Sequence, residues 1–445
     1  MMANLDSFGR VDRHPRQAMA LESAVESLRT ATADGPSLLA FGNGKSYGDT
    51  CHNAAGVLVP MRTRHAITGF DAETGVITAE AGATLEELIA HSAPHGLFLP
   101  VTPGTRFVTL GGAIANDVHG KNHHLRGTFG CHVVSLTLLR SDGTEYRCSP
   151  AENADLFAAT IGGMGLTGLI LGASVRLMRV GSLDVEECIT PFAGLEDYFA
   201  LAEAADAANE YAVAWIDQLA SSNRGVLLTG NHAQNGTFTP QVKATRLGVP
   251  FEMPFSMLNG LSLKLFNAAY FHAKARKTEV HLSPYGSFFY PLDAVGNWNR
   301  LYGPKGLHQH QSIIPFDAAD RVIPALLKAS RDAGQASFLT VLKRFGAVAS
   351  PGRLSFPKPG YTLTMDFSNR GASTLKLLEA LDRLTIDAGG RVNPYKDQRM
   401  SAATFAAGFP EWSRLERYRD PRFSSDFWRR TALSLSAHAP ALAAE

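Results

Sequence analysis

The residues best suited to chemistry lie in one stretch, from Thr102 to His124, which reads T-P-G-T-R-F-V-T-L-G-G-A-I-A-N-D-V-H-G-K-N-H-H. Its glycines stand among small apolar residues, and it closes on His119, Lys121, His123 and His124. Glycine lets the backbone approach a ligand closely and leaves amide N–H groups exposed as donors. Small residues beside a Gly-Gly pair leave room for a flat group. The stretch therefore favours a flavin cofactor and an oxidoreductase.

A second glycine-rich segment, G-N-G-K-S-Y-G-D at residues 42–49, follows a short apolar run at residues 37–41. A strand that feeds such a turn is typical of phosphate binding, because consecutive backbone N–H groups converge on the anion. The spacing of a Walker loop is absent. A plain tight turn is the alternative explanation of these residues alone.

The segment G-M-G-L-T-G at residues 163–168 matches the pattern G-x-G-x-x-G, but its context is reversed. A dinucleotide fingerprint should follow a strand and open a helix. Here residues 154–161 have helical spacing, and residues 169–180 alternate like a strand. The sequence therefore argues against a Rossmann domain, although these glycines can still approach a cofactor from a loop.

The elements that position these residues predict an α+β chain. Residues 21–30 have helical spacing, and Thr84 with Glu87 forms a capping box that starts a second helix. Strands are predicted at residues 37–41, 57–60, 75–81 and 97–100, and a hairpin at residues 133–148. From about residue 184 aromatic residues become frequent, which indicates a domain boundary near residue 182.

Polar residues stand inside the strands predicted for the second region, at residues 306–312, 338–345 and 361–367. Gln309 and Gln311 share one face of their strand. Lys343 lies in an otherwise apolar run, where an amine is costly unless it is paired or faces a cleft. We therefore expect a large sheet with one polar face that points into a cleft.

Length and composition exclude several classes of protein. With 445 residues the chain is long for one core, which favours two domains. A net charge of +1 gives no basic surface, so no nucleic-acid partner is expected. The four cysteines lie far apart without C-x-x-C spacing, which argues against a disulfide framework.

No targeting or membrane-spanning segment is expected. Residues 1–16 are polar and lack the apolar core of a secretory signal. Residues 258–275 come nearest to a spanning helix but contain Lys264 and Lys274. A half-buried helix is favoured there over a helix on a membrane surface. The expected location is the cytoplasm or the periphery of a membrane.

Several segments together resemble the flavin domain of the vanillyl-alcohol-oxidase superfamily: residues 42–49, 103–106, 111–115 and 117–124. More narrowly, the chain is similar to the family of decaprenylphosphoryl-β-D-ribose 2′-oxidases, the oxidative subunits of an epimerase in cell-wall arabinan synthesis. This resemblance continues through residues 162–168, 298–304, 354–357 and 396–397, so it covers nearly the whole chain.

The resemblance implies a two-domain flavoprotein. A PCMH-type FAD-binding domain would comprise residues 1–182 and 391–445, around a substrate domain at residues 183–390 built on an antiparallel sheet. The implied cofactor-binding residues are Gly42, Asn43, Gly44, Lys45, Ser46, Tyr47, Gly48, Asp49, Gly104, Thr109, Leu110, Gly111, Gly112, Asn116, Asp117, His119, Ile170 and Asn393. Many superfamily members bind FAD covalently through a histidine whose place is taken here by Lys45, so noncovalent FAD is expected.

Alcohol oxidation needs a hydride acceptor, which the flavin provides, and a base for the hydroxyl proton. The implied catalytic residues are Lys396, Tyr47 and His119. A free lysine has a pKa near ~10.4, so Lys396 acts as a base only where burial or a cation lowers that pKa; otherwise it donates a hydrogen bond. The expected substrate-binding residues are Lys121, Gln309, Gln311, Lys343, Thr362 and Thr364. A metal site at His119, His123 and His124 is the weaker alternative, because cysteine and further carboxylate ligands are missing.

The family's substrate is a polyprenyl-phosphoryl ribose, oxidised at its C2 hydroxyl before a short-chain dehydrogenase partner completes the epimerisation. Four positions depart from the family: Thr364 replaces a cysteine, Thr362 an asparagine, and Phe289 and Asn393 each a tyrosine. The resemblance therefore implies the flavin chemistry more strongly than the substrate. Two alternatives stay open: an alditol or aldonolactone oxidase that uses O₂ on a soluble polyol, and a noncatalytic binding protein.

Overall fold

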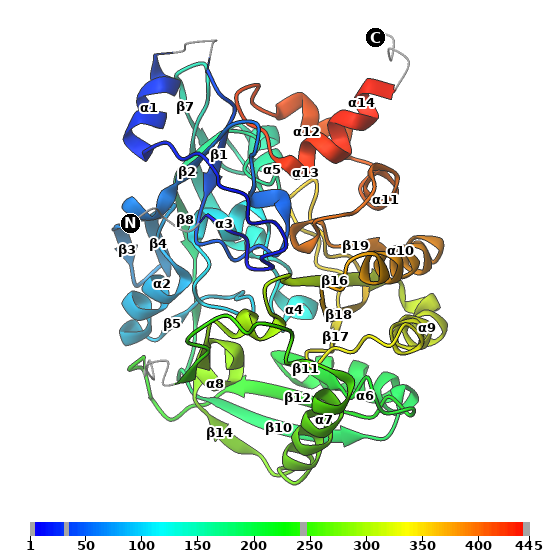
Figure 1. The fold of residues 1–445 in the computed structure, drawn as a ribbon. Helices are drawn as coiled ribbons and strands as arrows, with labels where there is room; N and C mark the ends of the chain where they lie inside the picture. The colour runs from blue at the N-terminus through cyan, green and yellow to red at the C-terminus, as the bar shows by residue number, and fades with distance from the viewer. Residues whose placement is uncertain (1–4, 31–34, 241–246, 439–445) are drawn as a thin grey trace.

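The fold contains two main antiparallel sheets that face a shared interior. The computed structural model describes residues 5–30, 35–240 and 247–438. Figure 1 shows the N-terminal elements in blue and cyan on one side, the green strands of the larger sheet at the lower end, and the red C-terminal helices at the top. The α+β class expected from the sequence is confirmed.

The smaller sheet has the strand order β3-β4-β8-β6-β7, with every neighbouring pair antiparallel. Its strands are β3 (Ile67–Asp71), β4 (Val76–Glu80), β6 (Val133–Leu139), β7 (Glu145–Cys148) and β8 (Leu169–Arg176). Beside it lie α1 (Leu21–Arg29), α2 (Leu85–Ser92), α3 (Leu110–Ala115), α5 (Ala154–Thr160), the parallel pair β1 (Leu38–Phe41) and β2 (Val57–Pro60), and the short pair β5 (Leu97–Phe98) and β9 (Met178–Arg179).

Two local predictions are confirmed in this part. Thr84 and Glu87 form the capping box of α2, in which the Thr84 N–H donates to the Glu87 carboxylate at 2.7 Å. The glycine-rich segment at residues 162–168 follows α5 and precedes β8, so its order is the reverse of a dinucleotide fingerprint. Gly162 and Gly165 have positive φ, which explains why glycine is needed in this turn.

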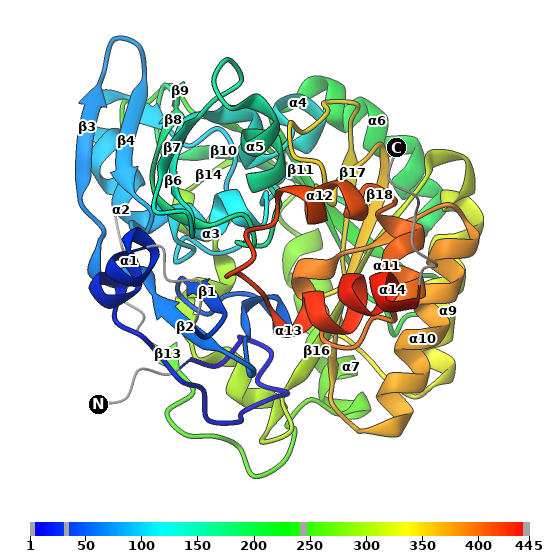
Figure 2. The same ribbon diagram turned by 90° about the horizontal axis from the view of Figure 1, so that it is seen from above.

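The larger sheet has eight antiparallel strands in the order β14-β10-β12-β11-β17-β18-β16-β19. Its strands are β10 (Val185–Phe192), β11 (Tyr211–Ile216), β12 (Gly225–His232), β14 (His281–Ser283), β16 (Leu307–Ile314), β17 (Val341–Phe345), β18 (Gly360–Ser368) and β19 (Arg391–Val392). One face packs under α6 (Leu195–Ala208), α9 (Ala319–Asp332) and α10 (Ala372–Asp387), which Figure 2 shows along one side of the molecule.

The register of this sheet gathers polar side chains on its other face. Gln309 pairs with Asp366, Gln311 pairs with Thr364, and Lys343 pairs with Thr362. Because side chains alternate across a strand, these residues share the face opposite α6, α9 and α10. The expected polar face therefore exists, and it points toward the glycine-rich segments.

The C-terminal segment packs against the first part of the chain. It contains α11 (Ala402–Gly408), α12 (Trp412–Tyr418), α13 (Asp426–Trp428) and α14 (Ser434–His438). Phe427 and Trp428 share a core with Phe41 of β1. Strand β19, at residues 391–392, joins the larger sheet instead. The division into residues 1–182, 183–390 and 391–445 stays a prediction.

Helix α7 (Gly260–Ala275) covers the end of the sheet's polar face, beyond the polar residues themselves. It packs on β10 and β12, with Leu263 and Asn267 buried. Short helices α4 (His123–Arg126) and α8 (Tyr285–Phe289) and strands β13 (Leu247–Gly248) and β15 (Val295–Gly296) lie in the connections. None of the helices in the described part of the chain is long and apolar enough to cross a membrane.

Candidate active site

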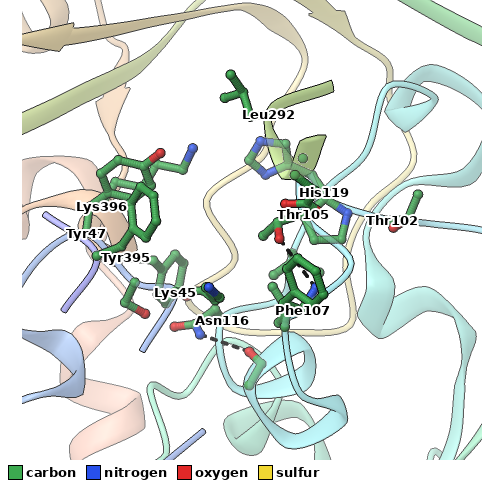
Figure 3. Close-up of a pocket in the computed structure, with 18 of the residues that line it drawn as sticks. Lys45, Tyr47, Thr102, Thr105, Phe107, Asn116, His119, Leu292, Tyr395 and Lys396 are labelled. Carbon is green, nitrogen blue, oxygen red and sulfur yellow. Dashed lines mark hydrogen bonds between the residues drawn. The ribbon is translucent and has the colours of Figure 1, made fainter. Parts of the chain in front are cut away.

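A cavity of about 520 Å³ lies between the glycine-rich segments and the polar face of the larger sheet. Figure 3 shows Lys396, Tyr47 and Tyr395 on one wall and His119, Thr105 and Phe107 across from them. The predicted residues that line the cavity are Gly42, Asn43, Gly44, Lys45, Ser46, Tyr47, Gly104, Thr109, Gly111, Gly112, Asn116, His119, Lys121, Ile170, Gln309, Lys343, Thr364, Asn393 and Lys396. Segments distant in sequence thus meet at one site.

Four residues predicted to bind the cofactor lie outside the cavity wall. Gly48 allows close packing, because a Cβ there would lie 1.6 Å from the Asp397 carbonyl oxygen. The carboxylate of Asp49 pairs with Arg430 at 2.7 Å and so anchors the C-terminal segment. Leu110 is buried in the core of the smaller sheet.

Asp117 is the fourth such residue, and its carboxylate serves as a buried anchor. It accepts hydrogen bonds from the Gly130 N–H at 2.8 Å and from the Ser350 and Ser355 hydroxyls at 2.5 Å each. Burial raises the pKa of this carboxyl, while these hydrogen bonds lower it. Asp117 therefore holds the 350–355 loop against the glycine-rich stretch.

The cavity wall fits an FAD molecule. A Cβ at Gly104 would meet no atom within 4 Å, so a side chain there would fill space that the cavity now offers. At Gly42 a Cβ would lie 2.5 Å from the Thr109 hydroxyl, so the turn after β1 packs directly on the start of α3. The glycines thus leave a backbone-lined wall, as a flat cofactor with a pyrophosphate requires.

Lys45 occupies this wall among aromatic rings. Its ammonium lies 5.7 Å from the centre of the Phe8 ring and 5.5 Å from that of Phe107. Burial lowers its pKa, and the nearby Asp293 carboxylate partly opposes that shift. The Asn43 side chain donates to the Phe107 carbonyl at 2.8 Å, which fixes the turn next to Lys45.

Three half-buried lysines lie together in the opposite part of the cavity. Burial lowers the pKa of Lys396, and the Asp366 carboxylate opposes that shift. Burial and the charges of Lys396 and Lys121 lower the pKa of Lys343 to about 7. Burial lowers the pKa of Lys121 to about 8, and its amine donates to the Phe288 carbonyl. Clustered amines of this kind suit an anionic or hydroxyl-rich ligand.

A chain of hydrogen bonds sets the protonation of His119. The Tyr395 N–H donates to Asn393 Oδ1 at 3.0 Å, so the Asn393 amide donates from Nδ2 to Gln311 Oε1 at 2.8 Å. Gln311 Nε2 then donates to His119 Nε2 at 3.0 Å and to Thr362 at 3.0 Å. His119 Nε2 is therefore an acceptor and the proton lies on Nδ1.

The environment keeps His119 neutral. Burial and the nearby Lys343 and Lys396 amines hold its pKa well below its usual range. Its ring packs against Phe345, with the ring centres 4.9 Å apart. Gln311 and Thr362, which were predicted to bind substrate, act behind His119 rather than in the cavity wall.

His123 and His124 face other groups than His119 does. The His123 ring packs at a tilt against Phe345, with the ring centres 4.4 Å apart, and His124 Nδ1 lies 3.6 Å from an Asp206 carboxylate oxygen. Within the described residues, no three His, Cys, Asp or Glu side chains are grouped so that they could hold a metal ion.

Asp366 is a site residue that the sequence analysis did not select. It is fully buried and accepts a hydrogen bond from Gln309 Nε2 at 2.5 Å. Burial raises its pKa, and the Lys396 ammonium opposes that shift. It follows Thr364 by two residues, so strand alternation could have placed it on the same face. Trp215 and Tyr270, which line an apolar end of the cavity, carried no comparable signal.

Comparison with known proteins agrees with this site. A family model described as an FAD binding domain matches residues 18–149. Decaprenylphosphoryl-β-D-ribose oxidase of Mycolicibacterium smegmatis is 34% identical over 422 residues, which cover 91% of this chain and 91% of that protein. L-gulonolactone oxidase of Mus musculus is 31% identical over 36% of each chain. Delta(24)-sterol reductase of Homo sapiens is 29% identical over 28% of this chain and 24% of its own.

Proposed function

This chain belongs to the family of FAD-dependent oxidoreductases that includes decaprenylphosphoryl-β-D-ribose oxidase, and from that premise we propose that it oxidises the C2 hydroxyl of a polyprenyl-phosphoryl pentose to a ketone. The observation that carries the proposal is the arrangement of the cavity. Amines gather across from a glycine-lined wall, and an apolar extension leads away from them. Such a cavity offers separate surroundings for a cofactor, a phosphorylated sugar and a hydrocarbon chain.

FAD, when bound along the glycine-rich wall, supplies the acceptor for the hydride that leaves the sugar carbon. The residues that would hold it are those of the turn at residues 42–47 together with Gly104, Thr109, Gly111 and Asn116. No histidine stands in that turn. We propose noncovalent FAD, because the Lys45 amine there is held between two aromatic rings.

Lys396 is the proposed base for the substrate hydroxyl. Its amine lies in the cavity, 5.6 Å from the centre of the Tyr47 ring. The low-dielectric surroundings lower its pKa, so that a larger fraction of the amine is neutral and able to accept a proton. Tyr47 fixes one side of the amine. His119, neutral and with Nε2 engaged by Gln311, supplies shape and polarity rather than a proton.

Lys343 and Lys121 are the proposed contacts for the phosphate or sugar hydroxyls. Beyond them the cavity is lined by Trp215, Leu228 and Tyr270, with the ion pair of Lys274 and Glu187 beside them. The three apolar side chains suit the first isoprene units of a lipid chain. A soluble polyol would leave this surface exposed to water. The ketone product requires reduction to complete an epimerisation, so a reductase of the short-chain dehydrogenase class is the proposed partner.

The test is anaerobic bleaching of the flavin by candidate substrates. A prenyl-phosphoryl ribose should bleach the absorbance near the flavin maximum, whereas free ribose, an alditol and an aldonolactone at equal concentration should not. Bleaching by the alditol or the aldonolactone alone would replace the proposal with the soluble-polyol oxidase. A holoenzyme that no candidate bleaches would contradict the oxidation of any of these substrates.

A further inference from the structure

The exposed hydrophobic side chains of this protein are concentrated in one segment. Within the described residues, most of the large exposed ones lie between residues 251 and 282, on and around α7. The main members are Phe255, Met257, Leu261, Leu265 and Phe266, which we call the α7 patch. Leu261 is 70% exposed and Leu265 is 65% exposed. Leu261 and Leu265 are one turn apart and share a face of α7. Exposed apolar side chains grouped in this way usually mark a site of interaction.

Basic residues dominate the middle of this segment, which Glu252 and Glu279 flank. Residues 253–278 contain Lys264, Lys274, Arg276 and Lys277 but no aspartate or glutamate. Lys274 points inward, with its amine 3.8 Å from buried Glu187, whereas the other three cations are exposed. A helix with apolar and basic residues on its outer side is suited to an anionic lipid surface, because lipid headgroups and acyl chains satisfy both.

The α7 patch is continuous with the substrate cavity. Tyr270 and Lys274 of α7 line the cavity from the inner side of the helix. Phe266 lies one turn before Tyr270 on the same side of the helix, is 47% exposed, and stacks on Tyr270 with the ring centres 6.0 Å apart. In Figure 1, α7 lies at the lower end of the molecule beside β10, away from the C-terminal helices. A lipid chain that leaves the apolar end of the cavity would therefore reach the surface beside the patch.

We propose that the α7 patch docks the protein on an anionic lipid bilayer, with Leu261 and Leu265 inserted among the acyl chains and Lys264, Arg276 and Lys277 against the headgroups. The docked orientation presents the apolar end of the cavity to the bilayer that carries the substrate. The value of this orientation rests on the proposed function, but the docking itself does not.

The experiment is sedimentation of the FAD-loaded protein with vesicles of phosphatidylglycerol and phosphatidylcholine, and with vesicles of phosphatidylcholine alone. The wild type should sediment with the anionic vesicles and much less with the neutral ones. The double variant Leu261→Ser/Leu265→Ser should bind roughly tenfold or more weakly, since both side chains lose their transfer to hydrocarbon. The double variant Leu125→Ser/Leu375→Ser, at exposed leucines elsewhere, is the matched control and should bind like the wild type.

Flavin bleaching by a short-chain, water-soluble prenyl-phosphoryl ribose separates the proposed membrane docking from the proposed oxidation. This substrate should bleach the flavin equally in the wild type and in both double variants. When the substrate is embedded in vesicles, only the Leu261→Ser/Leu265→Ser variant should lose bleaching. A wild type that bleaches but does not bind anionic vesicles would overturn the docking and leave the function intact. Light scattering that shows a wild-type dimer and a monomeric α7 variant, without vesicle binding, would instead assign the patch to a second copy of this chain.

Discussion

The side-chain amide of Gln309 donates to Asp366 at 2.5 Å inside the larger sheet, next to the wall that carries Lys396. The two residues pair across β16 and β18, so their alignment is set by the register of the sheet. Asp366 is buried, and its carboxylate raises the pKa of Lys396 against the effect of burial. Asp366 therefore acts on the reaction through the lysine, as a positioning residue.

Replacement of Asp366 by asparagine should move the pH dependence of kcat. Lys396 must be neutral to accept the hydroxyl proton, so activity falls as pH decreases through the lysine pKa. Without the carboxylate, the Lys396 pKa is lower, and this acidic limb should shift to lower pH. The pH profile of flavin reduction under saturating substrate measures the shift.

Asparagine keeps an acceptor for Gln309, so the fold should survive, which circular dichroism and the flavin spectrum would verify. If the variant instead loses the same fraction of activity at every pH, and the pH at which kcat falls is unchanged, Asp366 has a structural role only.

Lys396→Ala should lower the rate of flavin reduction by about 10²- to 10⁴-fold, the usual contribution of a general base. Because the substrate keeps its contacts with Lys343 and Lys121, KM should change much less than kcat. Added methylamine should restore part of the rate, since a small amine can occupy the vacated space. Stopped-flow absorbance of the flavin gives both quantities.

Lys376→Ala, at an exposed lysine on α10, is the control and should behave like the wild type. A large rise in KM with kcat unchanged would make Lys396 a binding residue and assign the base to another group.

Flavin attachment is decided by acid precipitation of the purified protein. The absorbance should move entirely into the supernatant, because the turn that follows β1 contains no histidine and its Lys45 is held between the Phe8 and Phe107 rings. Colour that stays in the pellet after the chain is unfolded would demonstrate a covalent bond. Mass spectrometry of the pellet would then identify the modified residue.

The local pattern of the sequence is sufficient to predict the helices and strands nearest the cofactor wall. The capping box at Thr84, the strand before the glycine-rich turn and the helix–strand order around residues 163–168 depend on neighbours within a few residues. Alternation likewise placed Gln309 and Gln311 on one strand face. These features are fixed by backbone geometry and short-range hydrogen bonds, which a single sequence expresses directly.

The remaining features depend on partners that are distant in the chain. Its place in a glycine-rich stretch predicts that Asp117 contacts the cofactor. In the structure its carboxylate accepts a hydrogen bond from Ser350, which lies 233 residues away in the chain. Gln311 reaches His119 across 192 residues. Strand β11, Tyr211–Ile216, is a nearly continuous apolar run without alternation, because both of its faces are covered. No single-sequence pattern specifies which segments meet in this way.

Gly104→Val tests the cofactor wall without disturbing the fold. A Cβ at this position meets no atom of the protein within 4 Å, and the backbone φ is not positive, so the apoprotein should unfold at an unchanged temperature. The added methyl groups would occupy cavity space that FAD needs, and FAD affinity should fall roughly tenfold to a hundredfold.

Gly260→Val, at another open glycine outside the cavity wall, should leave FAD affinity unchanged and is the matched control. Titration of the apoproteins with FAD, followed by quenching of flavin fluorescence, measures both variants. A Gly104 variant that keeps wild-type affinity would show that the cofactor does not pass this glycine, and it would move the proposed flavin path to another part of the cavity.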